Sequence, residues 1–153
     1  MRKPLKIALV ASAGGHLTQL LKVADAWAGQ SAVCVTTSEV VRRKLEPFGP
    51  VYVVGECNRE HLLETAKVFG RCIKIVWRER PGVVISTGAA PGCLVCLLGK
   101  LFGAKVVWLD SIANTERLSL SGRMVRPFAD LILSQWPDVA SRYRNVEYAG
   151  AVI

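Results

Sequence analysis

The residues with the clearest chemical potential are two glycines and a histidine near the start of the chain. Gly14, Gly15 and His16 follow an apolar run over residues 5–10 and come directly before a helical pattern over residues 17–27. Adjacent glycines let the backbone turn sharply toward a ligand, and the N–H groups at a helix start favour an anion. Imidazole exchanges a proton near neutral pH. We expect either an anion-binding turn with a base, or a plain turn whose histidine caps the helix.

Two further polar loops follow apolar runs. In the first, Thr87 and Gly88 precede Pro91, and proline is common in the first turn of a helix. The second offers three hydrogen-bonding side chains, those of Asp110, Ser111 and Asn114. Ligands gather at the carboxyl ends of the strands in open parallel sheets. We therefore expect all three loops to face one crevice.

Apolar runs alternate with helical patterns along the whole chain. The runs predicted as strands cover residues 5–10, 32–36, 51–54, 83–86, 105–109 and 130–133. Several lack polar alternation, which is typical of parallel strands covered by helices on both faces. The pattern predicts an α/β fold: a single Rossmann-like domain over residues 1–153, with a doubly wound, mostly parallel sheet.

Several common sites lack their defining residues. The His16 loop has no third glycine of the dinucleotide fingerprint, and no Gly-Lys-Ser/Thr follows it. Cys93 and Cys96 form one Cys-x-x-Cys pair, but a second pair that would complete a zinc site is missing from the sequence. We expect no metal and no cofactor. The five cysteines lie mostly in apolar segments, which favours buried, reduced thiols on the cytosolic side.

The chain carries a net charge of +8, which indicates an acidic partner: nucleic acid, anionic lipid or a phosphorylated substrate. Residues 60–80 form two stripes at helical spacing. The apolar stripe, expected to dock the helix on the sheet, is Leu62, Ala66, Phe69, Ile73 and Val76. The basic stripe is Lys67, Arg71, Lys74 and Arg78. It is either a solvated face or a contact with anionic lipid headgroups.

Two other segments allow alternatives. Residues 91–102 are apolar nearly all round; we expect them in the core, because the run is short and Lys100 interrupts it. No run approaches the roughly 18 apolar residues that span a bilayer. After the third loop come Arg117, Ser121 and Arg123. Serines before a helix are common N-caps, but arginines beside a glycine also suit a diphosphate.

Four motifs together resemble one family across essentially the whole chain. They are Ala-Ser-Ala-Gly-Gly-His-Leu, Ser-Thr-Gly-Ala-Ala-Pro, Trp-Leu-Asp-Ser-Ile-Ala-Asn and Leu-Ser-Leu-Ser-Gly-Arg. The family comprises the acceptor halves of split glycosyltransferases. Its members serve in bacterial exopolysaccharide or capsule synthesis, and as the membrane-recruiting subunit of the eukaryotic transferase that adds the second N-acetylglucosamine to dolichol-diphosphate-linked N-acetylglucosamine. The chain is similar, more distantly, to the N-terminal domain of the MurG family.

The resemblance implies the N-terminal half of a GT-B glycosyltransferase, in which two Rossmann-like domains face each other across a cleft. One domain binds a UDP-sugar, and the other receives a polyprenyl-diphosphate-linked sugar acceptor. The chain ends near the point where the linker to the donor domain would begin. The resemblance therefore implies either a separate UDP-sugar-binding subunit or a truncation, and a peripheral place on the cytoplasmic face of an anionic membrane surface.

Position by position, the resemblance implies roles for single residues. Those matching acceptor-binding loops are Gly14, Gly15, Thr87 and Gly88, with Ser111, Asn114, Arg117, Ser121 and Arg123 beside them. An inverting transfer needs a base for the acceptor hydroxyl, and His16 and Asp110 are the candidates. His16 could instead orient the acceptor diphosphate. Asp110 stands where many relatives carry glutamate.

Two other functions stay open. The chain could be a scaffold that recruits the donor-binding subunit to the membrane and supplies no catalytic group. A nucleic-acid-binding module is motivated by the charge alone. The tryptophans are scattered and form no aromatic platform, so we expect no nucleic-acid partner.

Overall fold

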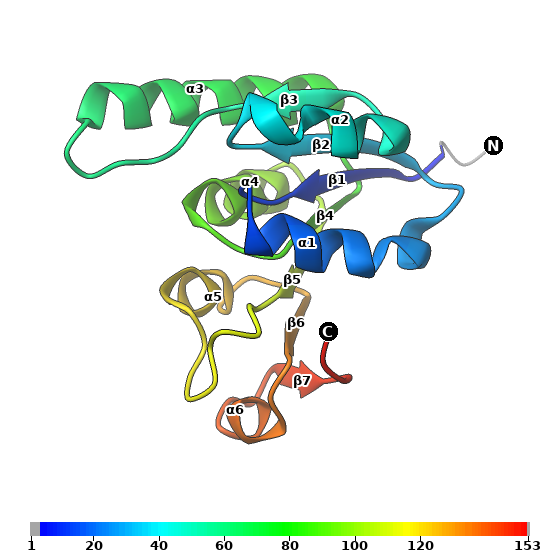
Figure 1. The fold of residues 1–153 in the computed structure, drawn as a ribbon, viewed down its shortest axis with the longest axis vertical. Helices are drawn as coiled ribbons and strands as arrows, with labels where there is room; N and C mark the ends of the chain where they lie inside the picture. Colours follow the sequence, from blue (N-terminus) through cyan, green and yellow to red (C-terminus); the bar gives the residue numbers. More distant parts are fainter. Residues whose placement is uncertain (1–3, 153) are drawn as a thin grey trace.

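The computed structural model describes residues 4–152, and its centre is one seven-stranded parallel sheet (Figure 1). The strands are β1 (Lys6–Val10), β2 (Ser31–Thr36), β3 (Val51–Val53), β4 (Val83–Ser86), β5 (Lys105–Leu109), β6 (Leu131–Ser134) and β7 (Val146–Tyr148). Their order across the sheet is β3-β2-β1-β4-β5-β6-β7. The order reverses between β1 and β4, which is where open α/β sheets place their ligands.

The register brings the ends of the central strands to one level. Val10 at the end of β1 pairs with Val35 of β2 and with Ser86 of β4. Ser86 in turn pairs with Trp108 of β5. The loops that follow β1, β4 and β5 therefore leave the sheet side by side.

The helices form two unequal layers. They are α1 (Gly15–Lys22), η1 (Ala24–Trp27), η2 (Glu39–Val41), α2 (Arg42–Leu45), η3 (Glu46–Phe48), α3 (Leu62–Glu79), α4 (Ala90–Leu101), α5 (Leu120–Val125) and α6 (Pro137–Ser141). The larger core cluster joins α3, α4, α5 and α6 to one face of the sheet. The smaller one joins α1, η1 and α2 to the other face, mainly at β1 and β2.

The second face of the sheet is consequently open over β4, β5 and β6. An apolar groove of about 330 Å³ lies there, and its floor is made by the strand residues Ile85, Val107, Leu109, Leu131 and Leu133. Trp27 and the segment 149–152 form its sides. Helices were expected on both faces of the sheet. They cover one face completely and the other face only in part.

Most predicted elements are confirmed. All six predicted strands agree within one residue at each end. The short edge strand β7 is missing from the prediction, because Val146–Tyr148 has too few apolar residues to form a pattern. The predicted helix over residues 17–27 begins earlier, at Gly15, and breaks into α1 and η1.

The predicted docking stripe of α3 is wrong at every position except Val76. The helix packs through Val68, Cys72, Ile75 and Val76, whereas Leu62, Ala66, Phe69 and Ile73 remain exposed. The true inner stripe lies about a quarter turn around the helix. In α4, Val95, Cys96 and Leu98 are buried as expected, but Leu97 and Leu101 are exposed. Among the described residues, no helix has the length and apolarity to cross a membrane.

Candidate active site

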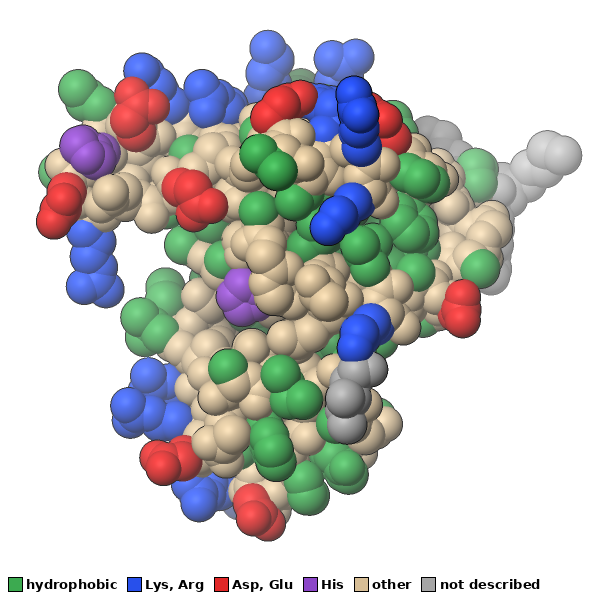
Figure 2. All heavy atoms as spheres, viewed as in Figure 1, with side chains coloured by type: hydrophobic (Ala, Val, Ile, Leu, Met, Phe, Trp, Pro, Cys, Tyr) green, Lys and Arg blue, Asp and Glu red, His purple; other side chains and the backbone are tan. Residues whose placement is uncertain are grey.

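The turn between β1 and α1 brings His16 to the carboxyl edge of the sheet. Gly14 is the residue before the helix, with φ 103° and ψ −140°, a conformation that favours glycine. Gly15 and His16 are then the first two residues of α1. Figure 2 shows a recess at this edge of the molecule, between the beginning of α3 and α5.

His16 is tied to the second loop by two hydrogen bonds. Its Nδ1 lies 2.9 Å from the carbonyl oxygen of Thr87, and the Thr87 hydroxyl donates to the carbonyl oxygen of His16 at 2.6 Å. A carbonyl oxygen only accepts, so Nδ1 carries the hydrogen. In the neutral ring Nε2 then holds the lone pair, and it has no hydrogen-bond partner within residues 4–152. The half-buried imidazole therefore presents a base in a fixed orientation.

Gly88 is required by the position of that ring. A Cβ on Gly88 would lie 2.4 Å from both Cε1 and Nδ1 of His16, and the residue has φ 144°. Next to it, Ala89 takes φ 71° and ψ 167°, a region that almost only glycine populates. Thr87 and Gly88 are buried. The Thr87 hydroxyl and carbonyl hold His16, and the missing side chain of Gly88 leaves room for its ring. Thr87 has no exposed side-chain atom for the predicted direct contact with an acceptor.

Two helix N-termini meet at this edge without any carboxylate. Neither α1 nor α4 has an acidic residue in its first turn. In the described part of the chain, the N–H groups of Gly15, His16 and Leu17 donate to no backbone acceptor. Free N–H groups and the helix dipole attract anions. This edge is suited to a phosphate or diphosphate.

Asp110 is buried and holds the third loop in place. Its Oδ1 accepts from Trp108 Nε1 at 3.0 Å and from the Ser119 hydroxyl at 2.6 Å, and its Oδ2 accepts from the Ser119 N–H at 2.8 Å. Ser119 caps α5 by accepting from the Gly122 N–H. Both carboxylate oxygens are therefore engaged within the fold. This geometry favours a positioning role for Asp110 over proton transfer, and leaves His16 as the better base.

Two glutamines that the sequence analysis did not single out connect the site. Gln19 accepts from the Ile112 N–H at 3.3 Å and lies 3.5 Å from the Ser111 hydroxyl, which joins α1 to the third loop. Gln135, just after β6, donates to Gln19 and to the Asp110 carbonyl, and accepts from the Val152 N–H at 2.7 Å. Gln19 stands one helical turn after His16, and Gln135 follows a predicted strand. These two positions in the sequence are the signals from which the glutamines could have been found.

The other predicted site residues lie in two places. Ser111 and Asn114 are half-buried in the third loop, whereas Arg117 is exposed in a shallow polar pocket over residues 113–117. Ser121 and Arg123 are on α5. Within residues 4–152, no hydrogen bond connects Arg117, Ser121 or Arg123 to the His16 turn. Their contact with an acceptor stays a prediction.

The four basic residues predicted to meet a membrane are all exposed on α3. Lys67 pairs with Glu64 at 2.9 Å, and Arg71 donates to the Val54 carbonyl at 2.9 Å. Lys74 and Arg78 lie on the same side of the helix. The cysteines are free thiols, and no group of three potential metal ligands occurs among the described residues.

Residues 51–152 match the family described as "Oligosaccharide biosynthesis protein Alg14 like". The chain belongs to this Alg14-like family. The match includes the Thr87 and Asp110 loops and begins after the His16 turn. Longer similarities to single Alg14-like proteins include that turn as well.

Two such relatives are named "UDP-N-acetylglucosamine transferase subunit ALG14". The protein from Eremothecium gossypii is 32% identical over 152 residues, which cover 95% of this chain and 58% of the relative. The protein from Yarrowia lipolytica is 28% identical over 124 residues, covering 77% of this chain and 57% of the relative. This Alg14-like chain thus spans less than three fifths of the length of these two relatives.

The crystal structure of Acinetobacter baumannii MurG has the same fold as this Alg14-like chain. The TM-score is 0.77 at 14% identity, and the similarity covers 95% of this chain but 46% of MurG. The predicted Rossmann-like fold of GT-B glycosyltransferases is confirmed. About half of the MurG chain has no counterpart here.

Proposed function

We propose that this Alg14-like chain is the acceptor-binding and membrane-attaching subunit of an inverting glycosyltransferase. The reaction transfers a sugar from a UDP-sugar to a polyprenyl-diphosphate-linked sugar acceptor, in oligosaccharide or polysaccharide synthesis. A second subunit binds the UDP-sugar. Two relatives that carry the name of a UDP-N-acetylglucosamine transferase subunit support this assignment.

The observation that carries the proposal is the orientation of His16. An inverting transfer forms a bond between an acceptor oxygen and the anomeric carbon of the donor, while the bond from that carbon to UDP breaks. The UDP leaves with the electron pair, and the acceptor hydroxyl loses its proton. Nε2 of His16 would take that proton, since Nδ1 is already bonded to the Thr87 carbonyl.

The acceptor diphosphate fits the same edge. The N-terminus of α1 offers free N–H groups, and no first-turn carboxylate on α1 or α4 opposes an anion. Binding the diphosphate here would place the attached sugar beside His16. Arg117, which is exposed in the third loop, adds a cation to this side of the molecule.

Membrane attachment is supported by the outer surface of α3 and α4. An apolar row of exposed side chains runs over both helices: Leu62, Phe69, Ile73, Trp77, Leu101 and Phe102. Trp77 and Phe102 pack edge to face, with ring centroids 6.1 Å apart. The basic stripe lies next to this row on α3, and Figure 2 shows Lys and Arg side chains gathered along that margin. Apolar side chains beside cations are typical of a surface that lies on an anionic membrane.

The open groove over β4, β5 and β6 suits the donor-binding subunit. Its walls are almost entirely apolar, and the structurally similar MurG chain is about twice as long as the part that matches. The Trp27 indole N–H is buried beside the groove and has no partner within residues 4–152. An apolar segment of the second subunit with one free carbonyl oxygen would cover the groove and accept that hydrogen.

The catalytic part is tested by His16→Ala in the complex with the donor-binding subunit. We expect turnover to fall by about 10² to 10⁴, the usual contribution of a general base. The two subunits must still co-purify, so that a loss of turnover reflects the missing imidazole and not a broken complex. Normal turnover by an intact complex would make the chain a recruiting scaffold without a catalytic group.

The membrane part is tested by replacing Phe69 and Trp77 with serine and measuring co-sedimentation with anionic vesicles. Vesicle binding should fall, because two large apolar contacts are lost. The matched control is Val40→Ser, which removes an exposed apolar side chain from η2 on a different part of the surface. Equal binding by both variants would argue against this surface as the membrane contact.

A further inference from the structure

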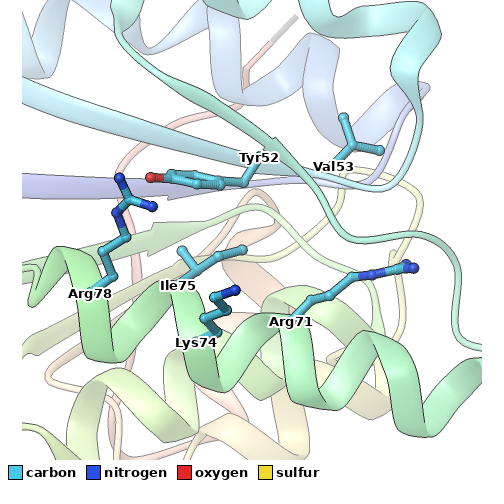
Figure 3. A pocket seen from close by; sticks show the side chains of 6 residues that line it. All are labelled: Tyr52, Val53, Arg71, Lys74, Ile75 and Arg78. Carbon is cyan, nitrogen blue, oxygen red and sulfur yellow. The ribbon is translucent and has the colours of Figure 1, made fainter.

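The edge of the sheet carries a pocket that the proposed transfer does not use. It lies between β3 and α3, has a volume of about 230 Å³, and is lined by Tyr52, Val53, Arg71, Lys74, Ile75 and Arg78 (Figure 3). A water molecule takes ~30 Å³ in the liquid, so the pocket has room for a phosphate group and a few carbon atoms. β2 separates β3 from β1, which places the pocket away from the His16 turn.

The pocket has an excess of positive charge. In the part of the chain that the structure describes, no carboxylate pairs with Arg71 or Lys74. Arg78 has one acidic neighbour, Glu79, at 4.0 Å. Glu79 is itself bound by Lys6 at 3.0 Å and by the Tyr52 hydroxyl. Arg71 and Lys74 therefore have no ion-pair partner among the described residues, and Arg78 has one weak ion pair.

Hydrogen bonds hold two of the lining side chains in place. Arg71 Nη1 donates to the Val54 carbonyl at 2.9 Å, which orients the guanidinium while its other N–H groups stay available. The Tyr52 hydroxyl donates to Glu79, and this bond raises the pKa of Tyr52 above its ordinary value. Figure 3 shows Arg78 beside the hydroxyl end of Tyr52 and Arg71 toward the other end of the pocket, and the Val53 side chain points away from α3. Ile75 lies between the two arginines.

We propose that this pocket binds the phosphate of a single anionic phospholipid headgroup. Guanidinium groups bind phosphate oxygens through paired, charge-assisted hydrogen bonds, and an ammonium group adds a point charge. Ile75 and the Tyr52 ring supply apolar surface for the carbon atoms of the headgroup. The inference rests on the proposed membrane attachment, since the apolar row on the same helix would bring the pocket to the lipid surface.

Two variants separate a defined site from diffuse charge attraction. Ile75→Phe enlarges a side chain that faces the pocket from α3 and leaves every charge in place. Lys74→Gln with Arg78→Gln removes two cations from the pocket. The matched control, Arg43→Gln with Lys44→Gln, removes two exposed cations on α2 that neither line the pocket nor belong to the basic stripe. Circular dichroism checks folding, and the surface variant K74Q/R78Q carries the test if I75F does not fold.

The measurement is co-sedimentation of the full chain with phosphatidylcholine vesicles. One set contains phosphatidylglycerol; the other has the same surface charge supplied by cholesteryl hemisuccinate, a carboxylate. We expect about tenfold tighter binding to the phosphatidylglycerol vesicles, as two charge-assisted hydrogen bonds would give. I75F and K74Q/R78Q should lose this preference, and R43Q/K44Q should keep it.

Four results would overturn the proposal. Equal binding to both vesicle types, or a preference that I75F retains, contradicts the lipid pocket but not the proposed membrane attachment. If the chain sediments with neither vesicle type, both the lipid pocket and the proposed membrane attachment are contradicted. Saturable binding of free glycerol phosphate to the pocket, seen by chemical shifts and without competition against the vesicles, assigns the site to a soluble phosphorylated ligand instead of a lipid.

Discussion

His16 and Thr87 hold each other through two hydrogen bonds that run in opposite directions. The imidazole Nδ1–H donates to the Thr87 carbonyl over 2.9 Å, and the Thr87 hydroxyl donates to the His16 carbonyl over 2.6 Å. The first bond sets the orientation of the ring, and the second fixes the backbone from which the ring projects. Two loops that are 71 residues apart in the chain thus form one rigid unit.

Thr87→Val removes the hydroxyl and keeps the carbonyl that orients the ring. We expect a loss of about 1–1.5 kcal/mol in the free energy of unfolding, the usual value of one hydrogen bond, and a smaller loss of turnover than His16→Ala causes. Urea denaturation and steady-state kinetics check both. Thr87→Ser retains the hydroxyl and should behave like the wild type. A Thr87→Ser variant as impaired as Thr87→Val would argue that the methyl group matters more than the bond.

Gly88→Ala places a methyl group where the His16 ring lies. A Cβ 2.4 Å from two ring atoms must displace the imidazole, and a displacement near 1 Å can cost on the order of 10² in rate. Stability should fall by about 1–3 kcal/mol. Gly70→Ala is the control, because a Cβ there meets nothing within 4 Å on α3. It should stabilise the helix slightly and leave turnover unchanged.

Asp110→Asn distinguishes a positioning residue from a base. The amide nitrogen would face donors on Trp108 and Ser119, so buried hydrogen bonds are lost. We expect a loss of about 2–3 kcal/mol in the free energy of unfolding, measured by urea denaturation. Turnover should fall in parallel with the loosening of the third loop. If the Asp110→Asn protein is as stable as the wild type but has no turnover, Asp110 acts as the base.

Asp130 links stability to acid pH. Lys100 and the Val106 N–H lower its pKa from 3.8 to about 2. The folded-state pKa is below the unfolded one, so this stabilisation is complete above about pH 4 and disappears as the pH falls through 2. Asp130→Asn should cost about 1 kcal/mol at pH 7, and the difference from wild type should shrink between pH 4 and 2.

Urea titrations at several pH values measure this difference. Asp25→Asn, at an exposed aspartate that has no ion pair within residues 4–152, should show no such change with pH. A constant difference between Asp130→Asn and wild type down to pH 2 would contradict the linkage.

Much of the fold was predictable because buried parallel strands leave long apolar runs in the sequence. The runs ending at Val10, Ser86 and Leu109 gave both the strands and the three loops. β7 escaped prediction because Glu147 interrupts its three residues, whereas the other three-residue edge strand, β3, is apolar throughout. The stripe of α3 was mispredicted for the opposite reason: Phe69 and Ile73 are apolar but stay on the surface. The spacing of apolar residues shows that one side of a helix is apolar, but it does not show whether that side contacts the sheet or remains on the surface.

The candidate site was only partly predictable. Glycines before a helix and a histidine at its start are local signals, so the His16 turn was found. The burial of Asp110 depends on Ser119 and Trp108, and the bridge between Gln19 and Gln135 joins residues 116 apart. Such contacts depend on how loops pack in three dimensions. No spacing in the sequence encodes them.

The groove over β4, β5 and β6 has a consequence for stability. A sheet with an apolar half-face open to water is not at its most stable alone, and any segment that covers Val107 and Leu131 adds its binding free energy to folding. At a ligand concentration about a hundred times its Kd that contribution is about 2.7 kcal/mol. The melting temperature of this chain then depends on the concentration of the segment that binds the groove, through mass action, as well as on the sequence.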